Sequence, residues 1–228
     1  LCDDLELEVE PGRVVRVQNG CALAEAPFMN DTRLKSPIRR TPAGGENISY
    51  DEAIKETADI LKDADRPLLY GWSSTHGEAQ SVGVHIAERI GAVIDNTSTV
   101  CHGPSILAIQ EVGHPGCTLG QVKNRADVVI YWGCNPIEAH PRHMSRYTTF
   151  ATGFFVPEAQ RERTIIVVDT RKNDSGGIAD EFVQIEPGGD YAVLSALRAI
   201  VRGKESILPR YVSGISKEQL IRVAGICK

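Results

Sequence analysis

Short apolar segments alternate with helical patterns along most of this 228-residue chain. Each apolar segment ends in glycine or polar residues, as buried strands do. Helical patterns fill the intervals, for example at residues 78–90 and 191–202. Such alternation favours mainly parallel sheets covered by helices on both faces. The predicted fold class is therefore α/β, with Rossmann-like domains. The candidate strands are 67–72, 92–95, 126–132, 164–169 and 182–185.

The amino-terminal region follows a different pattern. Residues 1–28 alternate apolar and polar side chains around a turn at Pro11-Gly12, which predicts a β-hairpin in a small β-rich subdomain. Residues 29–47 contain prolines and no long apolar run, so we expect an extended linker or a wrapping loop there. Cys2 is expected in the first strand of the predicted hairpin, and Cys21 just after its second strand.

A helix is expected to begin at Ser49, because Ser49 and Glu52 have the spacing of a capping box. Its predicted buried stripe consists of Ala53, Ile54, Thr57, Ile60 and Leu61. Together these patterns divide the chain into a β-rich subdomain with its linker, two α/β domains and the start of a further helical part. The expected limits are residues 1–47, 48–120, 121–205 and 206–228.

Polar and glycine residues follow four of the candidate strands. Ligands of parallel sheets bind beyond the carboxyl ends of the strands, and these residue types suit phosphates and ribose hydroxyls. The set predicts a dinucleotide-like ligand, although loops between strands and helices are commonly polar without binding anything. The candidate binding residues are Gly71, Ser73, Ser74, Thr75, Gly133, Asn135, Pro136, Asp169, Arg171, Gly188 and Asp190.

Cys101 and His102 stand side by side ahead of Gly103-Pro104 and an apolar helical run. A thiolate is a soft ligand that suits a redox metal, and a neighbouring imidazole can relay a proton. Proline at the first helical position is compatible with a helix that starts directly after this pair. The alternative is a small buried cysteine that packs at a strand end.

The remaining cysteines and histidines allow several interpretations. Cys2 and Cys21 are either two thiolate ligands of an iron–sulfur cluster or two structural cysteines. His140 and His143 lack an acidic or cysteine partner at ligand spacing, which argues against zinc. Arg142 and Arg146 either contact an anion or belong to a solvated helix start. We expect Cys117, Cys134 and Cys227 to be structural.

Composition excludes several classes of function. Lysine and arginine total 25 against 30 acidic residues, a net charge of −5, and no basic face indicates a nucleic-acid partner. No apolar run approaches the roughly 20 residues of a membrane helix. Six scattered cysteines fit reduced thiols or metal ligands in a cytoplasmic protein. The chain starts without methionine and stops inside a helical pattern, so we expect it to be a piece of a longer chain.

These motifs together resemble the B subunits of formylmethanofuran dehydrogenases, a family of molybdenum or tungsten enzymes related to formate dehydrogenases. The similarity runs through the whole chain, which would correspond to about the amino-terminal half of such a subunit. The matching stretches are residues 1–4 (LCDD), 19–21 (NGC), 70–75 (YGWSST), 99–105 (TVCHGPS), 131–136 (YWGCNP), 139–147 (AHPRHMSRY), 169–172 (DTRK) and 186–190 (EPGGD).

The resemblance implies an oxidoreductase that reduces carbon dioxide to formate for the formylation of methanofuran, a reversible first step of methanogenesis. Its metal is held by two molybdopterin guanine dinucleotides and one protein ligand, which would be Cys101, with His102 as the catalytic histidine. Cys2 and Cys21 match the last two ligands of a [4Fe-4S] cluster. The second α/β domain would bind pterin dinucleotide, and His140 and Arg142 join the cofactor-binding candidates. The other two cluster ligands and a catalytic arginine would lie outside this chain.

The resemblance also implies partner subunits: an amidohydrolase-like subunit, one that helps enclose the pterin, and ferredoxin-like electron-transfer subunits. Three other functions remain open. The chain could belong to a formate dehydrogenase with a different electron acceptor, or to a redox-inactive scaffold subunit of a formyltransferase/hydrolase complex. The strand-end loops alone would also suit a simple nucleotide-binding module. The thiolates at Cys2, Cys21 and Cys101 argue against the scaffold, which has no chemical need for them.

Overall fold

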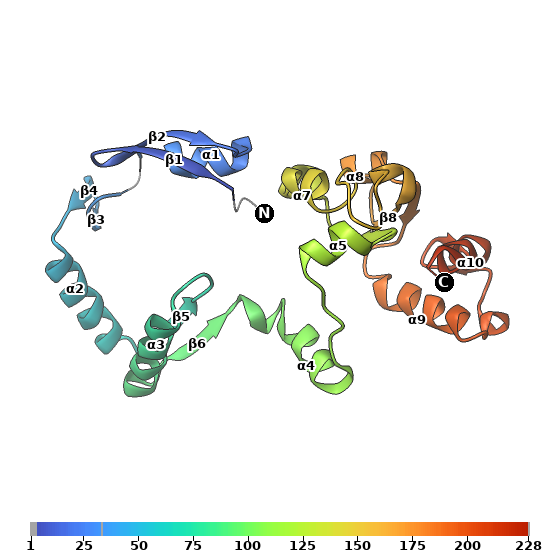
Figure 1. The fold of residues 1–228 in the computed structure, drawn as a ribbon. Coiled ribbons are helices and arrows are strands. Elements are labelled where there is room, and N and C mark those ends of the chain that lie inside the picture. Colours follow the sequence, from blue (N-terminus) through green and yellow to red (C-terminus); the bar gives the residue numbers. More distant parts are fainter. Residues whose placement is uncertain (1–3, 33, 228) are drawn as a thin grey trace. The chain divides into compact units, whose positions relative to one another are not determined.

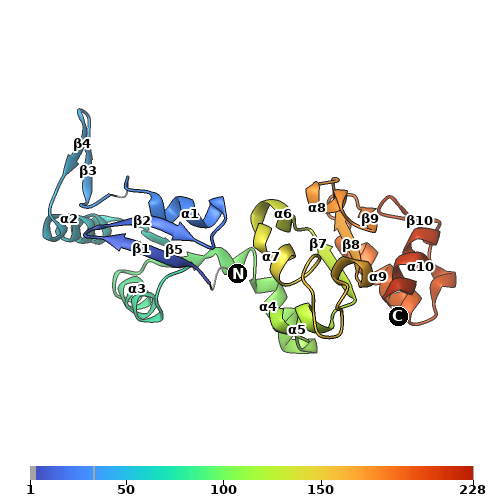
Figure 2. The same ribbon diagram turned by 45° about the horizontal axis from the view of Figure 1, so that its top comes forward.

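The computed structural model describes residues 4–32 and 34–227 (Figures 1 and 2). Their contacts divide these residues into two compact units. One unit joins residues 4–30 to residues 116–227, and the other consists of residues 31, 32 and 34–115. Both contain a small parallel sheet together with helices. The predicted α/β class is therefore confirmed.

The amino-terminal hairpin forms as predicted. Strand β1 (Glu6–Glu10) pairs antiparallel with β2 (Arg13–Gln18), and Gly12 makes the turn with a φ of 81° that glycine tolerates best. Directly after the hairpin the sequence pattern missed a helix, α1 (Ala22–Met29). Cys21 is its N-cap residue, and the Cys21 carbonyl accepts hydrogen bonds from the amides of Ala24 and Glu25.

A three-stranded parallel sheet forms the centre of the larger unit. Its strand order is β7-β8-β9, with β7 at Val128–Trp132, β8 at Thr164–Asp169 and β9 at Glu181–Gln184. The side chains of Ile165 and Val167 are buried on one face, where Met144 packs against them. Ile166 and Val168 are buried on the other face, because side chains alternate along a strand.

Helices cover both faces of this sheet, as predicted. Met144 belongs to α7 (Pro141–Arg146) on the first face, and α9 (Asp190–Val201) and α10 (Lys217–Ile226) supply Val193, Ala196, Leu220 and Val223 to the second. The other elements of the unit are α5 (Leu119–Arg125), α6 (Pro136–Ala139), η2 (Ala159–Glu162), α8 (Asp174–Gly177), η3 (Glu205–Ile207), β10 (Tyr211–Val212) and β11 (Ile215–Ser216).

A buried arginine holds together the loops at the amino-terminal edge of this sheet. Arg163, directly before β8, donates to the carbonyl oxygens of Ala126 at 3.0 Å and Thr148 at 2.6 Å. It also donates to the carbonyls of Lys123 and Ala151. One guanidinium thus satisfies four backbone acceptors that would otherwise be desolvated without partners.

The smaller unit begins with a hairpin where a linker was expected, so that prediction is wrong. Strand β3 (Ile38–Thr41) pairs antiparallel with β4 (Gly44–Asn47). The Thr41 hydroxyl donates to the Gly44 carbonyl at 2.9 Å and closes the turn. Helix α2 (Tyr50–Asp63) then starts with both hydrogen bonds of the predicted capping box, and Arg39 of β3 pairs with Glu56 of α2.

Two parallel strands follow, β5 (Leu68–Gly71) and β6 (Val93–Asn96), with α3 (Gly77–Ile90) between them in the chain. The unit ends with η1 (Thr97–Thr99) and α4 (Gly103–Val112). The predicted burial is wrong here: Ile54 and Ile60 of the α2 stripe are 65% and 69% exposed, and Leu68 of β5 is 59% exposed. The periodicity of apolar residues identifies a face that can be buried, but it does not show whether another part of the protein covers that face. Within residues 4–32 and 34–227, no helix has the length and apolar character that a membrane span requires.

Candidate functional site

The carboxyl ends of β5 and β6 bring two loops of the smaller unit to one edge. Gly71 and Asn96 are opposite each other in the parallel register, so the loops that follow them leave the sheet side by side. The hydroxyls of Ser73 and Thr97 share a hydrogen bond between these loops. Ser73 was a predicted site residue, whereas its partner Thr97 was not. Ser73 and Thr97 are 24 residues apart, so no local sequence pattern predicts their hydrogen bond.

The loop after β5 has an unusual backbone that its neighbours hold in place. Gly71, Trp72 and Ser74 have φ angles of 124°, 63° and 56°, in a region that residues other than glycine rarely adopt. The Trp72 ring occupies the space beside Gly83, where an added Cβ would lie 2.2 Å from the ring. Gln80 of α3 donates to the carbonyls of Trp72 and Thr75 at 3.0 and 3.1 Å. Ser73, Ser74 and Thr75 are therefore held at the strand end.

The loop after β6 positions Cys101. The Asn96 side chain caps η1 by accepting a hydrogen bond from the Ser98 amide at 2.7 Å, and the Thr99 hydroxyl donates to the Asp95 carboxylate. The Cys101 amide then donates to the Thr97 carbonyl at 3.1 Å.

The turn after Cys101 leads directly into α4. Gly103 leaves no room for a side chain, because an added Cβ would lie 2.9 Å from the Ser98 carbonyl oxygen. Pro104 stands in the first turn of α4, as predicted from its sequence position. Both Cys101 and His102 are exposed, so this turn presents a thiol and an imidazole at the edge where Ser73 also lies.

The carboxyl edge of the β7-β8-β9 sheet gathers most of the other predicted residues. Gly133, with a φ of 61°, follows β7 and donates its amide to the Val168 carbonyl at 2.8 Å. The Asn135 amide oxygen accepts a hydrogen bond from the Ser175 hydroxyl at 2.6 Å. The Asn135 amide nitrogen is buried and has no hydrogen-bond acceptor among the residues that the structure describes. A bound oxygen or nitrogen acceptor at this point would satisfy it.

The loops after β8 and β9 complete this edge. The Asp169 carboxylate accepts from the Asn173 side chain at 2.7 Å, and Asp190 accepts from the Trp132 indole nitrogen at 2.7 Å. Partial burial raises the pKa of the Cys134 thiol, and the Asp169 carboxylate raises it further. Gly188 has a φ of 80° in the loop that leads to α9.

Sequence reasoning found the strand-end positions but missed their partners. Asn173, Ser175 and Trp132 each bind a predicted site residue. Asn173 had a local signal, because its side chain caps the short helix α8 by accepting from the Gly176 amide at 2.9 Å. Arg171, the one cationic candidate in these three loops, is exposed.

Cys21 lies at a separate place in the larger unit. This half-buried residue lines a cavity of about 170 Å³ together with the turn between α6 and α7. Leu23, Ala24, Ala139, His140, Pro141 and Arg142 form the rest of the wall. His140 and Arg142 were predicted to bind a cofactor, and the structure brings both next to Cys21. Cys2, the other predicted cluster ligand, lies outside the described residues.

The two histidines of this turn, His140 and His143, lie in different surroundings. Within residues 4–32 and 34–227, no three His, Cys, Asp or Glu side chains gather as metal ligands would. A centre held by a single cysteine, as predicted for Cys101, would not form such a group. His143 instead packs edge-on against the Tyr131 ring at 6.1 Å, and burial lowers its pKa, with nearby His140 acting in the same direction.

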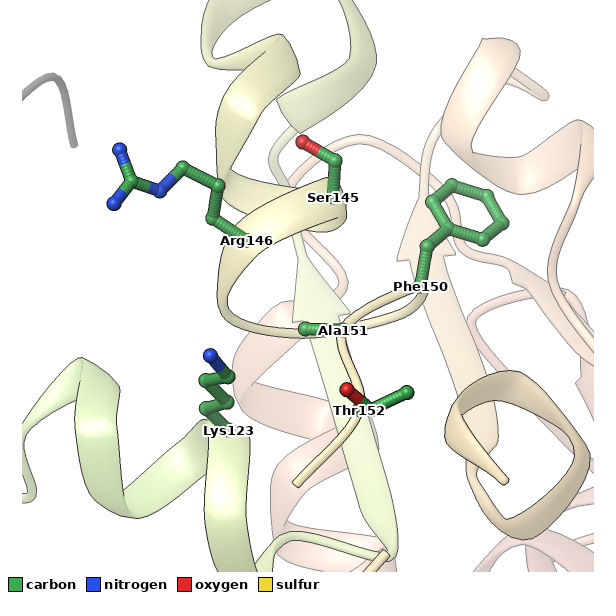
Figure 3. A pocket seen from close by; sticks show the side chains of 6 residues that line it. All are labelled: Lys123, Ser145, Arg146, Phe150, Ala151 and Thr152. Atoms are coloured by element: carbon green, nitrogen blue, oxygen red, sulfur yellow. The ribbon is translucent and has the colours of Figure 1, made fainter. Parts of the chain in front are cut away.

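Another cavity, of about 290 Å³, lies between α5 and α7 (Figure 3). Lys123 of α5 and Arg146 of α7 extend from its two sides, and Phe150 lies farther along the loop that follows α7. Arg146 forms an ion pair with Asp4 at 2.5 Å. Among the residues that line this cavity, Arg146 was considered from the sequence, as a possible anion contact. The lining residues are Lys123, Ser145, Arg146, Phe150, Ala151 and Thr152.

Comparison with known proteins relates this chain to a family. The B subunit of tungsten-containing formylmethanofuran dehydrogenase 2 from Methanocaldococcus jannaschii is 47% identical over 233 residues, which include the whole of this chain. The protein of the same name from Methanococcus maripaludis is 46% identical, again over the whole chain. The chain belongs to the family of formylmethanofuran dehydrogenase B subunits. It spans about half the length of these curated relatives, 53% and 54% respectively. No protein-family model matches it.

More distant relatives match parts of this chain. Formate dehydrogenase H of Escherichia coli is 28% identical over 193 residues, which cover 76% of the chain and 26% of the enzyme. In three dimensions the chain is similar to one in the formyltransferase/hydrolase complex (FhcABCD) from Methylorubrum extorquens, in complex with methylofuran. That similarity has a TM-score of 0.55 at 23% identity and covers 77% of this chain and 45% of the other. It shows a shared fold.

Proposed function

We propose that this chain is part of the redox subunit of formylmethanofuran dehydrogenase, which reduces carbon dioxide to formate for the formylation of methanofuran. The observation that carries the proposal is the exposed Cys101-His102 pair at the carboxyl edge of a parallel sheet, in a chain 47% identical to a tungsten-containing member of the family. Reduction consumes two electrons and one proton for each carbon dioxide and yields formate. The reaction is reversible.

The surroundings of Cys101 fit the role of the protein ligand to tungsten or molybdenum. A thiolate is a soft donor, and the backbone on both sides is held by the Thr97 carbonyl and the close approach of Gly103 to Ser98. When bound, the metal with two pterin dithiolenes supplies the two-electron redox chemistry. His102, the neighbouring residue, would hold or release the proton, since the nitrogens of an imidazole can both accept and donate one. Hydroxyls such as that of Ser73 would stabilise negative charge on the carboxylate.

The strand-end loops of the larger unit fit the binding of a molybdopterin guanine dinucleotide. The buried Asn135 amide nitrogen needs an acceptor, which a pterin or phosphate oxygen offers. Gly133 and Gly188 adopt positive φ angles that keep the backbone open to close approach, and the exposed Arg171 suits a phosphate. Pro136, Asp169 and Asp190 complete this proposed set, with Ser73, Ser74 and Thr75 proposed at the edge of the smaller unit.

Cys21 fits one ligand position of a [4Fe-4S] cluster. The wall of its cavity combines apolar groups of Leu23, Ala24 and Pro141 with the polar side chains of His140 and Arg142. Cys2 is proposed as a second ligand, and two more would come from outside this chain. The cluster would deliver the electrons for the reduction.

We further propose that the chain works with other subunits. Its relatives are each named as one subunit of an enzyme, and the similar fold comes from a complex of several subunits. An amidohydrolase-like subunit would consume the formate, another would help enclose the pterin, and ferredoxin-like subunits would carry electrons to the cluster.

Metal and pterin analysis of the full-length subunit, purified with its native partners, tests this proposal. We expect about one tungsten or molybdenum per subunit, about two pterin guanine dinucleotides, and iron. An assembled complex without metal and pterin would contradict the proposal and favour a redox-inactive scaffold. Carbon dioxide reduction without formation of formylmethanofuran would favour a formate dehydrogenase, the function of the relative that is 28% identical.

A further inference from the structure

Arg142 was predicted to bind a cofactor, but its guanidinium lies against the amino-terminal hairpin. Its two terminal nitrogens donate to the two carboxylate oxygens of Asp4 at 2.8 and 2.9 Å. One of them also donates to the Asn19 carbonyl. The two side chains of the ion pair are 20% and 40% exposed, so water screens this pair only in part. A bidentate contact of this kind fixes orientation as well as distance.

The two segments that Arg142 contacts are the ones that carry the proposed cluster cysteines. Asp4 is two residues after Cys2, and Asn19 is two residues before Cys21. The Asn19 side chain also donates to the Asp4 carbonyl at 3.0 Å, so the two segments are joined to each other as well. Asn19 has a φ of 60°, a backbone conformation that this asparagine contact helps to maintain. Asp4, Asn19 and Arg142 thus contact one another, and Arg146 of the same helix also pairs with Asp4 at 2.5 Å.

Cys21 and Arg142 also border the same cavity of about 170 Å³. Helix α7 therefore contributes to this cavity in two ways. Its Arg142 forms part of the cavity wall, and the same Arg142 holds the hairpin next to Cys21 in place. Arginine suits this position because its planar fork can satisfy a carboxylate and a carbonyl at once, whereas a lysine ammonium is a point charge.

On the basis of the proposed function, we infer that Arg142 is a positioning residue for the iron–sulfur cluster. Its guanidinium fixes the two segments next to Cys2 and Cys21 against α7, and its positive charge lies beside the cavity that Cys21 lines. A positive charge near a cluster stabilises the reduced form, which carries more negative charge, and so raises the midpoint potential.

The test uses the full-length subunit in its native complex, after its iron content has been measured. Arg142→Gln removes the fork and the charge, whereas Arg142→Lys removes the fork and keeps the charge. Arg13→Ala is the matched control, because Arg13 pairs with Glu10 on the exposed side of the same hairpin. Amide hydrogen exchange of residues 4–21 reports the contacts, and redox titration followed by electron paramagnetic resonance reports the cluster.

We expect exchange in residues 4–21 to become about tenfold faster in both Arg142 variants and to stay unchanged in Arg13→Ala. The midpoint potential should fall in Arg142→Gln and fall less in Arg142→Lys. Unchanged exchange in both Arg142 variants would overturn the inference, as would an unmoved potential in Arg142→Gln. A wild-type complex without iron would instead show that the proposed cluster is wrong, and the inference would fail with it.

Discussion

The hydroxyls of Ser73 and Thr97 hydrogen-bond to each other across the ends of two neighbouring parallel strands. Ser73 lies between Trp72 and Ser74, which both have positive φ angles. Thr97 begins the turn that leads to Cys101, and its carbonyl accepts a hydrogen bond from the Cys101 amide. A change in the first loop can therefore reach the proposed metal ligand through two hydrogen bonds. This coupling makes the packing around Trp72 a test of the site.

Gly83→Ala should destabilise the protein, although alanine normally improves a helix. The new Cβ would lie 2.2 Å from the Trp72 ring, so the ring must move and the loop after β5 with it. We expect a loss of about 1–3 kcal/mol in the free energy of unfolding, measured by urea denaturation. Gly77→Ala in the same helix is the control, because among the described residues no atom lies within 4 Å of its added Cβ. Equal stability of the two variants would contradict this packing.

Gly103→Ala should displace Cys101 without unfolding the chain. Its Cβ would lie 2.9 Å from the Ser98 carbonyl oxygen, a backbone atom that cannot move aside easily. We expect a severalfold loss of bound tungsten or molybdenum in the native complex, because metal ligation depends on sub-ångström placement of the sulfur. Gly120→Ala, whose nearest contact would be at 3.7 Å, should keep its metal. Full metal occupancy in Gly103→Ala would show that this turn does not position the ligand.

Much of the fold was predictable because local rules decide it. The capping box of Ser49 and Glu52 gave the start of α2, and the apolar segments gave all five parallel strands. The β3-β4 hairpin was missed, since its turn at Pro42-Ala43 lacks the usual asparagine–glycine signal. Helix α1 was missed because Pro27 stands inside it.

Arg163→Met should be strongly destabilising. The arginine is buried and donates to four backbone carbonyls, among them those of Ala126 and Thr148. Methionine fills a similar volume but leaves these acceptors unsatisfied, which should lower the free energy of unfolding by at least about 3 kcal/mol. Arg161→Met is the control, because Arg161 is 86% exposed. Similar denaturation midpoints for the two variants would contradict the structural role of Arg163.

The contact between β9 and α10 should make stability depend on pH. Arg222 hydrogen-bonds to the Glu181 carboxylate at 2.7 Å and lowers its pKa from the usual value, an effect that burial opposes and Gln219 strengthens. Because the folded pKa is lowered, the contribution is complete above the unfolded pKa and is lost as the pH falls through the folded pKa. Arg222 is largely exposed, so water screens this ion pair and its contribution to the free energy of unfolding should be small.

Denaturation at several pH values below 5 measures this dependence. Glu181→Gln should have a shallower decline of unfolding free energy with falling pH than the wild type. Glu158→Gln, which removes an exposed pair with Arg161, should follow the wild-type curve. Parallel curves for wild type and Glu181→Gln would contradict the assignment.

The site was less predictable than the fold. Strand ends identified Ser73, Asn135 and Asp190 as candidates, because polar residues after buried strands are a local signal. The hydrogen-bond partners of candidate residues come from distant positions. Trp132 is 58 residues from Asp190, and Asp4 is 138 residues from Arg142, another candidate. Arg142 and Arg146 are one helical turn apart in the sequence, but this spacing alone could not show that both pair with the Asp4 carboxylate.

The central claim is that Cys101 is the protein ligand of the metal, and X-ray absorption spectroscopy of the native complex tests it most directly. Cys101→Ser is compared with Cys117→Ser, which alters another exposed cysteine. We predict one sulfur ligand fewer at the tungsten or molybdenum and loss of carbon dioxide/formate interconversion in Cys101→Ser alone. An unchanged sulfur count with full activity in Cys101→Ser would contradict the claim.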